Sequence, residues 1–450
     1  MFAAFLGGSI AHAEAKATER PRLTLTQLIE AAQRSYPGVQ AARHALSAAR
    51  HQAARARWAF APRGRLTGLF APAPKIRCED STGAPNSTLC VRTPAIDATS
   101  VKIEGVMAQV VLDVGMPVYT FDKIGAAKRA AHAGIEVRKS QLIAAHQDLA
   151  LKVTQAYWAL KLARELLFTI KHGQKHLDSA RKRTEKQLEN QEGEVTEIDL
   201  LRLKTATAEV LSRRAKAREL ESLMLAALAT LCGKAQGSFD IDPTPLAVVP
   251  LELKALPHYM DLAEQYRPEL AMLNWALKAA QARTDLETAQ FYPNLLIVGT
   301  IGYGVASSVD TPENAFYNNP YNFVRAGFGL ALRWDIDPVG QVHKRRHAIA
   351  LQDQAKAQAA EARAGIRLQL QSALTTLEQA RETVQINHKG QKAARAWLVA
   401  AAQNLEAGLS ESKELTDALV GYFSLHVNYL QSIFNVNVGQ AQLMRATGRF

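Results

Sequence analysis

Two pairs of histidines are spaced as metal ligands could be. His172 and His176 are four residues apart, and so are His343 and His347. On a helix this spacing puts two imidazoles on one face, where they can bind a metal ion. Both pairs lie among lysines and arginines, which repel a cation. We therefore expect no metal site.

Motifs that would support catalysis are missing from the sequence. It contains no G-x-S-x-G, no H-E-x-x-H, no phosphate-binding loop and no dinucleotide-binding fingerprint. A nucleophile, a zinc-bound water or a bound nucleotide would each need one of these local arrangements. We therefore predict that the protein is not an enzyme and that it carries no cofactor.

The cysteines and the N-terminal residues favour export from the cytoplasm. Residues 1–13 are typical of the end of a secretory signal, with a small-x-small cleavage site at Ala11-His12-Ala13. Cys78 and Cys90 lie twelve residues apart in a segment rich in Pro, Ser, Thr and Asn. In an exported protein this spacing favours a loop-closing disulfide, with two free thiols as the alternative. Cys232 is expected to be a small buried side chain.

The net charge of +12 could suggest an anionic partner such as nucleic acid. Lys and Arg are, however, interleaved with Glu, as on the solvated faces of coiled coils. Two exceptions, Lys128-Arg129 and Lys344-Arg345-Arg346, recur at matching places in the two halves. No run of 18 apolar residues occurs, so we expect no membrane-spanning helix.

The elements that must position these residues follow from an internal repeat. Apolar side chains step by four and three residues from Leu149 to Ile170, and a seam with the same spacing runs from Ile366 to Asn387, 217 residues later. A period of 3.5 keeps one apolar stripe against a partner helix over many turns. The repeat predicts two halves built from long helices.

Proline spacing supports the same duplication. Pro37 and Pro62 are 25 residues apart, and so are Pro268 and Pro293. All prolines lie outside residues 118–242 and 339–450. Because proline costs about 3 kcal/mol inside a helix, these two tracts are where long helices can run.

After Pro62 and Pro293 the apolar pattern changes to a period of two. The clearest strand is predicted at 322–334, with Arg and Gly at odd positions and apolar residues at even ones: Val324, Ala326, Phe328, Leu330, Leu332 and Trp334. This two-sided alternation is typical of a transmembrane β-strand with one face toward lipid. Its upstream partner is predicted at 294–304, and residues 65–70 and 101–114 play the same parts in the first half. The alternative is a soluble ribbon packed on the helices.

The predicted domain order is as follows. A signal remnant (1–13) precedes a first repeat (22–235), with strands at about 63–115, a long helix at about 126–190 and a return helix at about 195–231. A linker (236–258) leads to a second repeat (259–448), with a helix at about 269–292, strands at about 294–334, a long helix at about 341–406 and a return helix at about 411–447. Matched corners join strand to helix at Asp122 and Gly125 and at Asp337 and Gly340, and Gly193 and Gly408 suit the helix reversals.

The sequence resembles the TolC family of outer-membrane efflux channels over about residues 22–448. The resemblance is carried by Leu23–Ile29 (LTLTQLI) with Tyr36-Pro37, by the matched corners, by Glu406–Ser410 (EAGLS) followed by Glu414–Ala418 (ELTDA), and by the repeat. It implies a mainly α-helical fold, in which antiparallel coiled-coil helices form a periplasmic α-barrel. Four strands per chain would contribute to a trimeric, twelve-stranded transmembrane β-barrel.

The resemblance also implies a function, a location and partners. The expected function is a passive outer-membrane exit duct for a tripartite efflux or type I secretion system in a Gram-negative-type envelope. The expected partners are two further copies of the chain, a periplasmic adaptor protein, an inner-membrane pump of the RND or ABC type, and outer-membrane lipids that the basic corners could meet. Nucleic acid is not expected. The cargo is left open.

The resemblance implies a periplasmic gate near the second helix reversal. The matching residues are Glu414 and Asp417, three apart on one helix face, which in three copies form an acidic ring. Glu197 and Asp199 in the first reversal are further candidates. The alternative is that these are solvated helix charges. No arginine lies between Gly408 and Glu414, where some family members have a basic residue that locks the gate.

Two other functions remain open from the sequence alone. One is a soluble periplasmic coiled-coil scaffold without a barrel. The other is a basic coiled-coil protein that binds nucleic acid, which would show retardation of DNA that weakens steeply with salt.

Overall fold

The computed structural model describes residues 20–78, 82, 84–85, 103–190, 195–311, 318–407, 409 and 412–450. The chain divides into two compact units. The first consists of Met1–Leu46, Arg138–Leu273 and Ala359–Phe450, and the second of Ser47–Val137 and Asn274–Gln358. Each unit therefore takes residues from both halves of the sequence.

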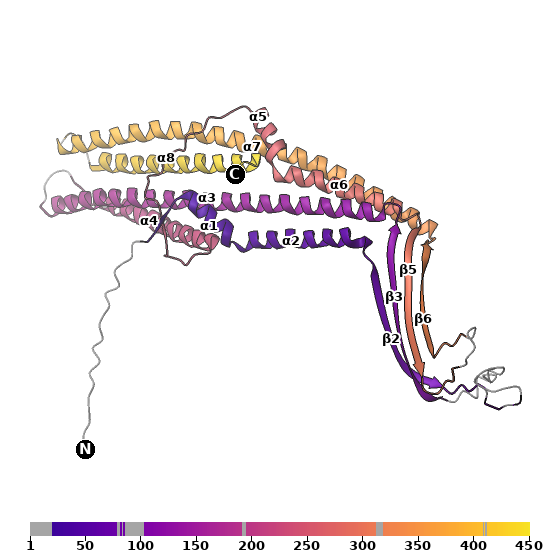
Figure 1. Ribbon diagram of the computed structural model, residues 1–450. Helices are drawn as coiled ribbons and strands as arrows, with labels where there is room; N and C mark the ends of the chain where they lie inside the picture. The colour runs from indigo at the N-terminus through magenta and orange to yellow at the C-terminus, as the bar shows by residue number, and fades with distance from the viewer. Residues whose placement is uncertain are drawn as a thin grey trace, which may run out of the picture. The chain divides into compact units, whose positions relative to one another are not determined.

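The elements of the two halves correspond one to one (Figure 1). The first half contains α1 (Leu25–Ser35), α2 (Pro37–Arg57), β2 (Arg63–Pro74), β3 (Ile103–Tyr119), α3 (Lys123–Asn190) and α4 (Glu197–Cys232). The second half contains α5 (Leu256–Tyr266), α6 (Pro268–Ala289), β5 (Asn294–Ala306), β6 (Phe323–Arg333), α7 (Pro338–Glu406) and α8 (Ser412–Thr447). The matched long helices have 68 and 69 residues, and the return helices have 36 each. The mainly helical fold and the internal duplication are confirmed.

The predicted seams form the core of the first unit. Leu149, Val153 and Leu160 of α3 are at most 2% exposed and pack with Leu28 of α1 and Leu228 of α4. A 3.5-residue repeat keeps these side chains on the same side of α3, so the helix buries one continuous stripe.

The second seam is buried in the same way. Leu370 and Leu377 of α7 are at most 1% exposed and pack against Val436 and Leu443 of α8, and Figure 1 shows α7 and α8 running alongside each other. The polar member of this seam, Asn387, donates from Nδ2 to the carbonyl of Asn428 on α8 at 3.1 Å. The seam thus ends in a hydrogen bond rather than an unpaired amide.

The linker between the halves is held to α3 by polar contacts around Asp242. The Lys161 ammonium lies 3.0 Å from the Asp242 carboxylate and also donates to the Thr244 carbonyl at 3.0 Å. The Tyr157 hydroxyl donates to Asp242 as well. Burial opposes ionisation of Asp242, but the hydrogen bonds from Thr244, Tyr157 and Lys161 outweigh it and lower the pKa to about 2. At neutral pH the linker is therefore anchored by a charged carboxylate.

The second unit contains one four-stranded antiparallel sheet in the order β2-β3-β5-β6. The central pair, β3 and β5, joins the two halves of the sequence. β2 carries Pro72 and Pro74. Proline has no backbone N–H to donate, so it suits a strand at the sheet edge, which has a neighbouring strand on one side only. Two short strands elsewhere, β1 (Arg22–Leu23) and β4 (Asp240–Ile241), pair in parallel.

Some predicted strand limits differ from those of the structure. β3 continues to Tyr119 instead of ending near Val114, because β5 pairs with it as far as Tyr119, with a register shift between Pro117 and Tyr119. Trp334 lies one residue beyond β6 and not within it. Local sequence does not contain the cross-strand pairing that decides these ends.

The hairpin end of the sheet is tied together by Asp310. Its carboxylate pairs with Arg77 at 2.7 Å and accepts from the backbone N–H of Cys78 at 3.1 Å. Cys78 is disulfide-bonded; its predicted partner, Cys90, lies outside the described residues. Cys232 is a buried free thiol, and burial raises its pKa to about 11. It therefore behaves as the expected inert core residue.

Within the described ranges, no helix combines the length and apolar character needed to cross a membrane.

The buried seams give a first test of the fold. Leu160→Ala and Leu377→Ala should each lower the free energy of unfolding by about 2–5 kcal/mol, because each leaves a cavity in a fully buried position. The exposed neighbour Lys152→Ala should change it by less than about 0.5 kcal/mol. Thermal unfolding of the purified protein, followed by circular dichroism, measures the difference. Equal midpoints for all three variants would contradict the seam assignment.

Candidate functional site

One face of the sheet is apolar and exposed. The strand register puts large apolar residues of all four strands on it, and we call it the apolar face. Its members are Leu66, Phe70, Val110, Leu112, Ile297, Ile301, Tyr303, Val324, Ala326, Phe328, Leu330 and Leu332. Phe328 is 94% exposed and Val324 is 83% exposed. The prediction made from one strand thus extends across the whole sheet, with Trp334 just beyond its end.

The opposite face, the polar face, carries arginine, glycine and small polar residues with a few aliphatic ones between them. Its polar and glycine members are Arg63, Arg65, Thr67, Gln109, Asp113, Gly115, Thr300, Gly302, Gly304, Arg325, Gly327, Gly329 and Arg333. A hollow of about 1080 Å³ lies over part of this face, toward the helical end of the strands. The two faces of the sheet therefore differ in composition, one apolar and the other polar and rich in glycine.

Aromatic side chains gather at the helical end of the sheet. The rings of Tyr119 and Phe121 are 4.7 Å apart, and Phe121 stacks on Tyr292 at 5.3 Å. Trp334 donates from Nε1 to the carbonyl of Phe291 at 3.2 Å and remains 54% exposed. Half-exposed aromatic rings next to an apolar face are typical of a membrane–water interface. The sequence pattern identified only Trp334 of this group, because Tyr119 lies beyond the predicted end of its strand and the other rings lie in corners outside the alternation.

The edges of the sheet are unpaired. β2 and β6 have a neighbour on one side only, and no other described strand lies beyond them. Their outer backbone N–H and C=O groups therefore need another partner if the sheet lies in lipid.

In the second corner, Asp337 begins helix α7. Its Oδ1 accepts from the backbone N–H of Gly340 at 2.9 Å, which satisfies one of the free N–H groups of the first turn. Pro338 occupies the first helical position, where its missing N–H costs nothing. A Cβ on Gly340 would overlap the Asp337 carboxylate. The Asp-x-x-Gly spacing is thus explained by sterics rather than by an unusual backbone angle at the glycine.

The first corner has the same spacing but different partners. The Thr120 hydroxyl accepts from the N–H of Ile124 at 3.4 Å. Phe121 and Asp122 have φ angles of 49° and 68°, in the left-handed region that non-glycine residues rarely adopt. A Cβ on Gly125 would again overlap an aspartate, here Asp122. This corner is therefore the more strained of the two.

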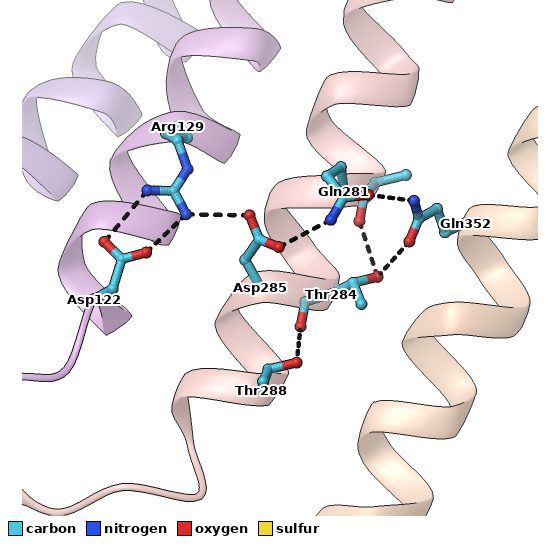
Figure 2. Close-up of polar contacts among 8 residues, drawn as sticks. Asp122, Arg129, Gln281, Thr284, Asp285, Thr288 and Gln352 are labelled. Atoms are coloured by element: carbon cyan, nitrogen blue, oxygen red, sulfur yellow. Dashed lines mark hydrogen bonds and ion pairs between the residues drawn. The ribbon is translucent and has the colours of Figure 1, made fainter.

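The Asp122 carboxylate is held by Arg129, one of the predicted basic residues. Figure 2 shows the guanidinium between Asp122 of the first half and Asp285 of α6, at 2.8 and 3.1 Å. A second contact to Asp122, at 3.3 Å, makes that pair bidentate. The hydrogen bonds to Asp122 and Asp285 outweigh desolvation and raise the pKa of Arg129. Arg129 holds the corner, and Asp285 could not have been identified as its partner from the sequence.

The network continues from α6 to α7. Gln281 donates to Asp285 at 2.9 Å and accepts from Gln352 of α7, and the Thr284 hydroxyl donates to Gln352 at 3.1 Å (Figure 2). Side chains from α3, α6 and α7 are thereby fixed to one another where the strands give way to helices. No group here is placed to attack or to protonate a substrate. These contacts hold the ends of α3, α6 and α7 together beside the sheet.

The other basic corner residues differ from one another. The Lys128 ammonium lies 4.4 Å above the ring centroid of Phe60. Lys344, at the position matching Arg129, is exposed beside a shallow hollow that Glu287 and Gln341 also line. Arg345 and Arg346 are exposed. The expectation that these residues meet headgroups is therefore weakest for Arg129, whose charge is already paired.

The four gate candidates lie near the starts of α4 and α8, with Glu197, Asp199 and Glu414 in the first turns and Asp417 in the second turn of α8. Glu197, Glu414 and Asp417 are exposed. The two helix starts are neighbours, because Leu203 of α4 and Leu419 of α8 share one buried cluster with Leu177 of α3. Acidic side chains in a first turn are stabilised by the helix dipole. The geometry therefore gathers these charges but does not by itself assign them to a gate.

Asp199 has a structural role. Its carboxylate accepts from the Thr196 backbone N–H at 3.1 Å, and its own N–H donates to the Thr196 hydroxyl at 3.4 Å, which completes a capping box. Arg202 lies 3.6 Å from it. Gly193 and Gly408, predicted at the reversal tips, lie outside the described residues.

The histidine pairs do not form a metal site in the described part of the chain, where no group of three or more His, Cys, Asp or Glu residues is arranged around a common point. His343 and His347 are exposed, and His172 packs against Phe168 at 4.5 Å.

The sequence matches a known family over part of its length, and the fold is similar to that of solved outer-membrane proteins. Residues 259–449 match the family described as outer membrane efflux protein. The fold is similar to that of the outer-membrane channel OprN, with 18% identity, a TM-score of 0.76, and coverage of 95% of this chain and 90% of that one.

Two further solved channels have the same fold. VceC of Vibrio cholerae has 17% identity and a TM-score of 0.75, over 94% of this chain and 96% of that one. MtrE of Neisseria gonorrhoeae in its open state has 18% identity and a TM-score of 0.74, over 96% and 89%. No curated protein matches the chain.

Glycine-to-alanine substitutions at the corners and within the long helices should change the free energy of unfolding in opposite directions. Gly125→Ala and Gly340→Ala should displace the aspartate carboxylate and lower the free energy of unfolding; for Gly340→Ala, where the carboxylate caps α7, the loss should be about 0.5–2 kcal/mol. Gly134→Ala on α3 and Gly365→Ala on α7 have open space within the chain and should raise it by about 0.5–1 kcal/mol. Thermal unfolding in detergent compares the four variants. Stabilisation by all four would show that the carboxylates are not needed at the corners.

Proposed function

We propose that three copies of the chain form the exit duct of a tripartite efflux or type I secretion system, because residues 259–449 match the outer membrane efflux protein family and the chain has the fold of the solved outer-membrane proteins OprN and VceC. The family is one of channels in the outer membrane with a periplasmic tube, and not of enzymes. The duct consumes no nucleotide itself. Energy comes from an inner-membrane pump of the RND or ABC type, which acts through a periplasmic adaptor.

The observation that carries the proposal is the exposed apolar face on a sheet with open edges. Strands of 11 to 17 residues are long enough to cross the hydrocarbon layer, which needs about 9–11 tilted residues. A face with Phe328 and Leu330 exposed would promote aggregation in water. In lipid the same face is stable, and the half-exposed aromatic rings mark one boundary.

Trimerisation follows from hydrogen bonding. A membrane-spanning sheet must pair every backbone group, so β2 of one copy needs β6 of the next. Three four-stranded sheets joined in this way make the twelve-stranded barrel that the sequence resemblance implies. A soluble scaffold, the alternative function, has no such need.

Neighbouring residues on opposite faces test the lipid contact. Ile301→Arg puts a charge on the apolar face near its middle and should cost about 2–4 kcal/mol, whereas Thr300→Arg points the charge to the polar face and should be tolerated. The measurement is the amount of trimer recovered by detergent from outer membranes. If the wild type is recovered without detergent, or both variants behave alike, a barrel in lipid is excluded.

The gate is proposed at the N-terminal end of α8. Glu414 and Asp417 are exposed and lie on one helix face, so three copies would bring six carboxylates together at the entrance. Mutual repulsion then favours opening, and docking of the adaptor would have to shift the equilibrium by only a few kcal/mol. Glu197 is a further candidate beside them. Asp199 is a weaker one because its carboxylate is already used for capping.

Thiol chemistry tests this gate. Native Cys232 is buried and Cys78 is disulfide-bonded, so neither should react with a charged methanethiosulfonate reagent added from the periplasmic side. In planar bilayers the reagent should reduce the current through Glu414→Cys and Asp417→Cys trimers, because a constriction is sensitive to added bulk and charge. The control, Asp353→Cys on α7, should change little. Unchanged current in both gate variants would rule out these residues, whereas absence of any current would count against the duct itself.

A further inference from the structure

The polar face of the sheet is dominated by one sign of charge. Arg63 and Arg65 of β2 face Gly115 and Asp113 of β3. Arg325 and Arg333 of β6 face Gly302 and Asn294 of β5. Four arginines against one aspartate give the described residues of this face a net charge of +3. All five of these charged side chains are exposed.

The positive charges are not neutralised within the described residues. None of the four arginines lies within ion-pair distance of a described carboxylate, and Asp113, directly opposite Arg65, makes no ion pair with it. The Arg325 guanidinium lies 4.7 Å from the centroid of the Phe323 ring, a contact that leaves its charge in place. The face therefore presents guanidinium groups to solvent.

Glycines give these side chains room. Gly115 and Gly302 lie directly opposite Arg63 and Arg325, so a long side chain can cross the sheet without a clash. Three of the arginines, Arg63, Arg65 and Arg333, line the hollow of about 1080 Å³ at the helical end of the face, together with Asp113. A concave surface lined by three arginines is suited to anions, because arginine presents N–H groups in a geometry that matches carboxylate and phosphate.

We propose that the polar face lines an anion-selective segment of the duct and that it favours anionic cargo, such as organic carboxylates or phosphates, over cationic cargo. This inference rests on the proposed function, since the face becomes a lumen only when three copies close. Three copies carry +9 in a narrow space with apolar walls outside it. Low-dielectric walls concentrate the field of such a charge and raise the local concentration of counter-ions. Rings of arginine select for anions in pores by the same effect.

The proposed gate would favour cations, whereas the polar face of the barrel would favour anions. Glu414 and Asp417 attract cations at the periplasmic entrance, whereas the arginines attract anions in the barrel. The two contributions come from separate residues, so they can be removed one at a time. A variant with Glu414→Gln and Asp417→Asn isolates the barrel contribution.

The test is the reversal potential of full-length trimers in planar bilayers under a KCl gradient at low ionic strength, where screening is weakest. In the Glu414→Gln, Asp417→Asn background, chloride should be more permeant than potassium. Adding R63Q, R65Q, R325Q and R333Q should shift the permeability ratio toward potassium, on the order of threefold or more. The matched control D113N removes the one acid of the face and should shift it toward chloride.

The outcomes separate this inference from the proposed function. If no variant conducts, the duct itself is wrong. If the trimers conduct but favour potassium in the gate-neutral background, or if the arginine variant and D113N leave the reversal potential unchanged, the anion-selective segment is wrong. If the fourfold variant does not assemble, R333Q alone against D113N still gives shifts of opposite sign, and equal reversal potentials for these two would overturn the proposal.

Discussion

A β-sheet in hydrocarbon must pair all of its backbone hydrogen-bonding groups, because no water is present to replace a missing partner. The sheet of this chain has four strands and two bare edges. A single copy therefore cannot satisfy this requirement, whatever the quality of its helical core. Under the proposed function, the edges explain assembly, the apolar face explains the location, and the polar face becomes the wall of a lumen. The long helices continue from the same strands through the two corners.

The corners show how a duplicated chain can reach one geometry by two routes. Asp337 caps its helix directly and accepts from a backbone N–H. Asp122 leaves capping to Thr120 and turns its carboxylate to Arg129, which also binds Asp285. The spacing between aspartate and glycine is kept because in both corners the carboxylate occupies the space of a glycine side chain. A motif can thus be shared for steric reasons while the interactions that stabilise it differ.

Much of the fold was accessible from the sequence because it depends on local periodicity. The heptad seams predicted α3 and α7, the proline spacing predicted the repeat, and the alternation in β6 predicted which side is apolar. The remaining features depend on register between distant strands and helices. The extension of β3 to Tyr119, the pairing of Arg129 with Asp285 and the gathering of four arginines on one face each require contacts across more than a hundred residues, which no local pattern encodes.

The candidate site was predicted only in part for the same reason. The apolar residues of β6 do share one exposed face, since alternation alone decides this, and the contact of that face with lipid stays a prediction. The roles of Glu414, Asp417 and Glu197 stay predictions, and Asp199 turned out to form a capping box, which the sequence Thr196-x-x-Asp199 could have indicated. The aromatic rings at the helical end were missed because they lie in corners, where neither a period of two nor a period of 3.5 applies.

Pro72 and Pro74 at the end of β2 have a consequence for how copies join. Neither residue can offer a backbone N–H, so a neighbouring strand finds a full set of donors only along Arg63–Ala71. The subunit seam is then strongest beside the helices and weakest at the outer rim. Strand pairing between copies would then begin at the helical end of the sheet and proceed toward the outer rim. The rim would be the last part of the barrel to pair and the first to separate.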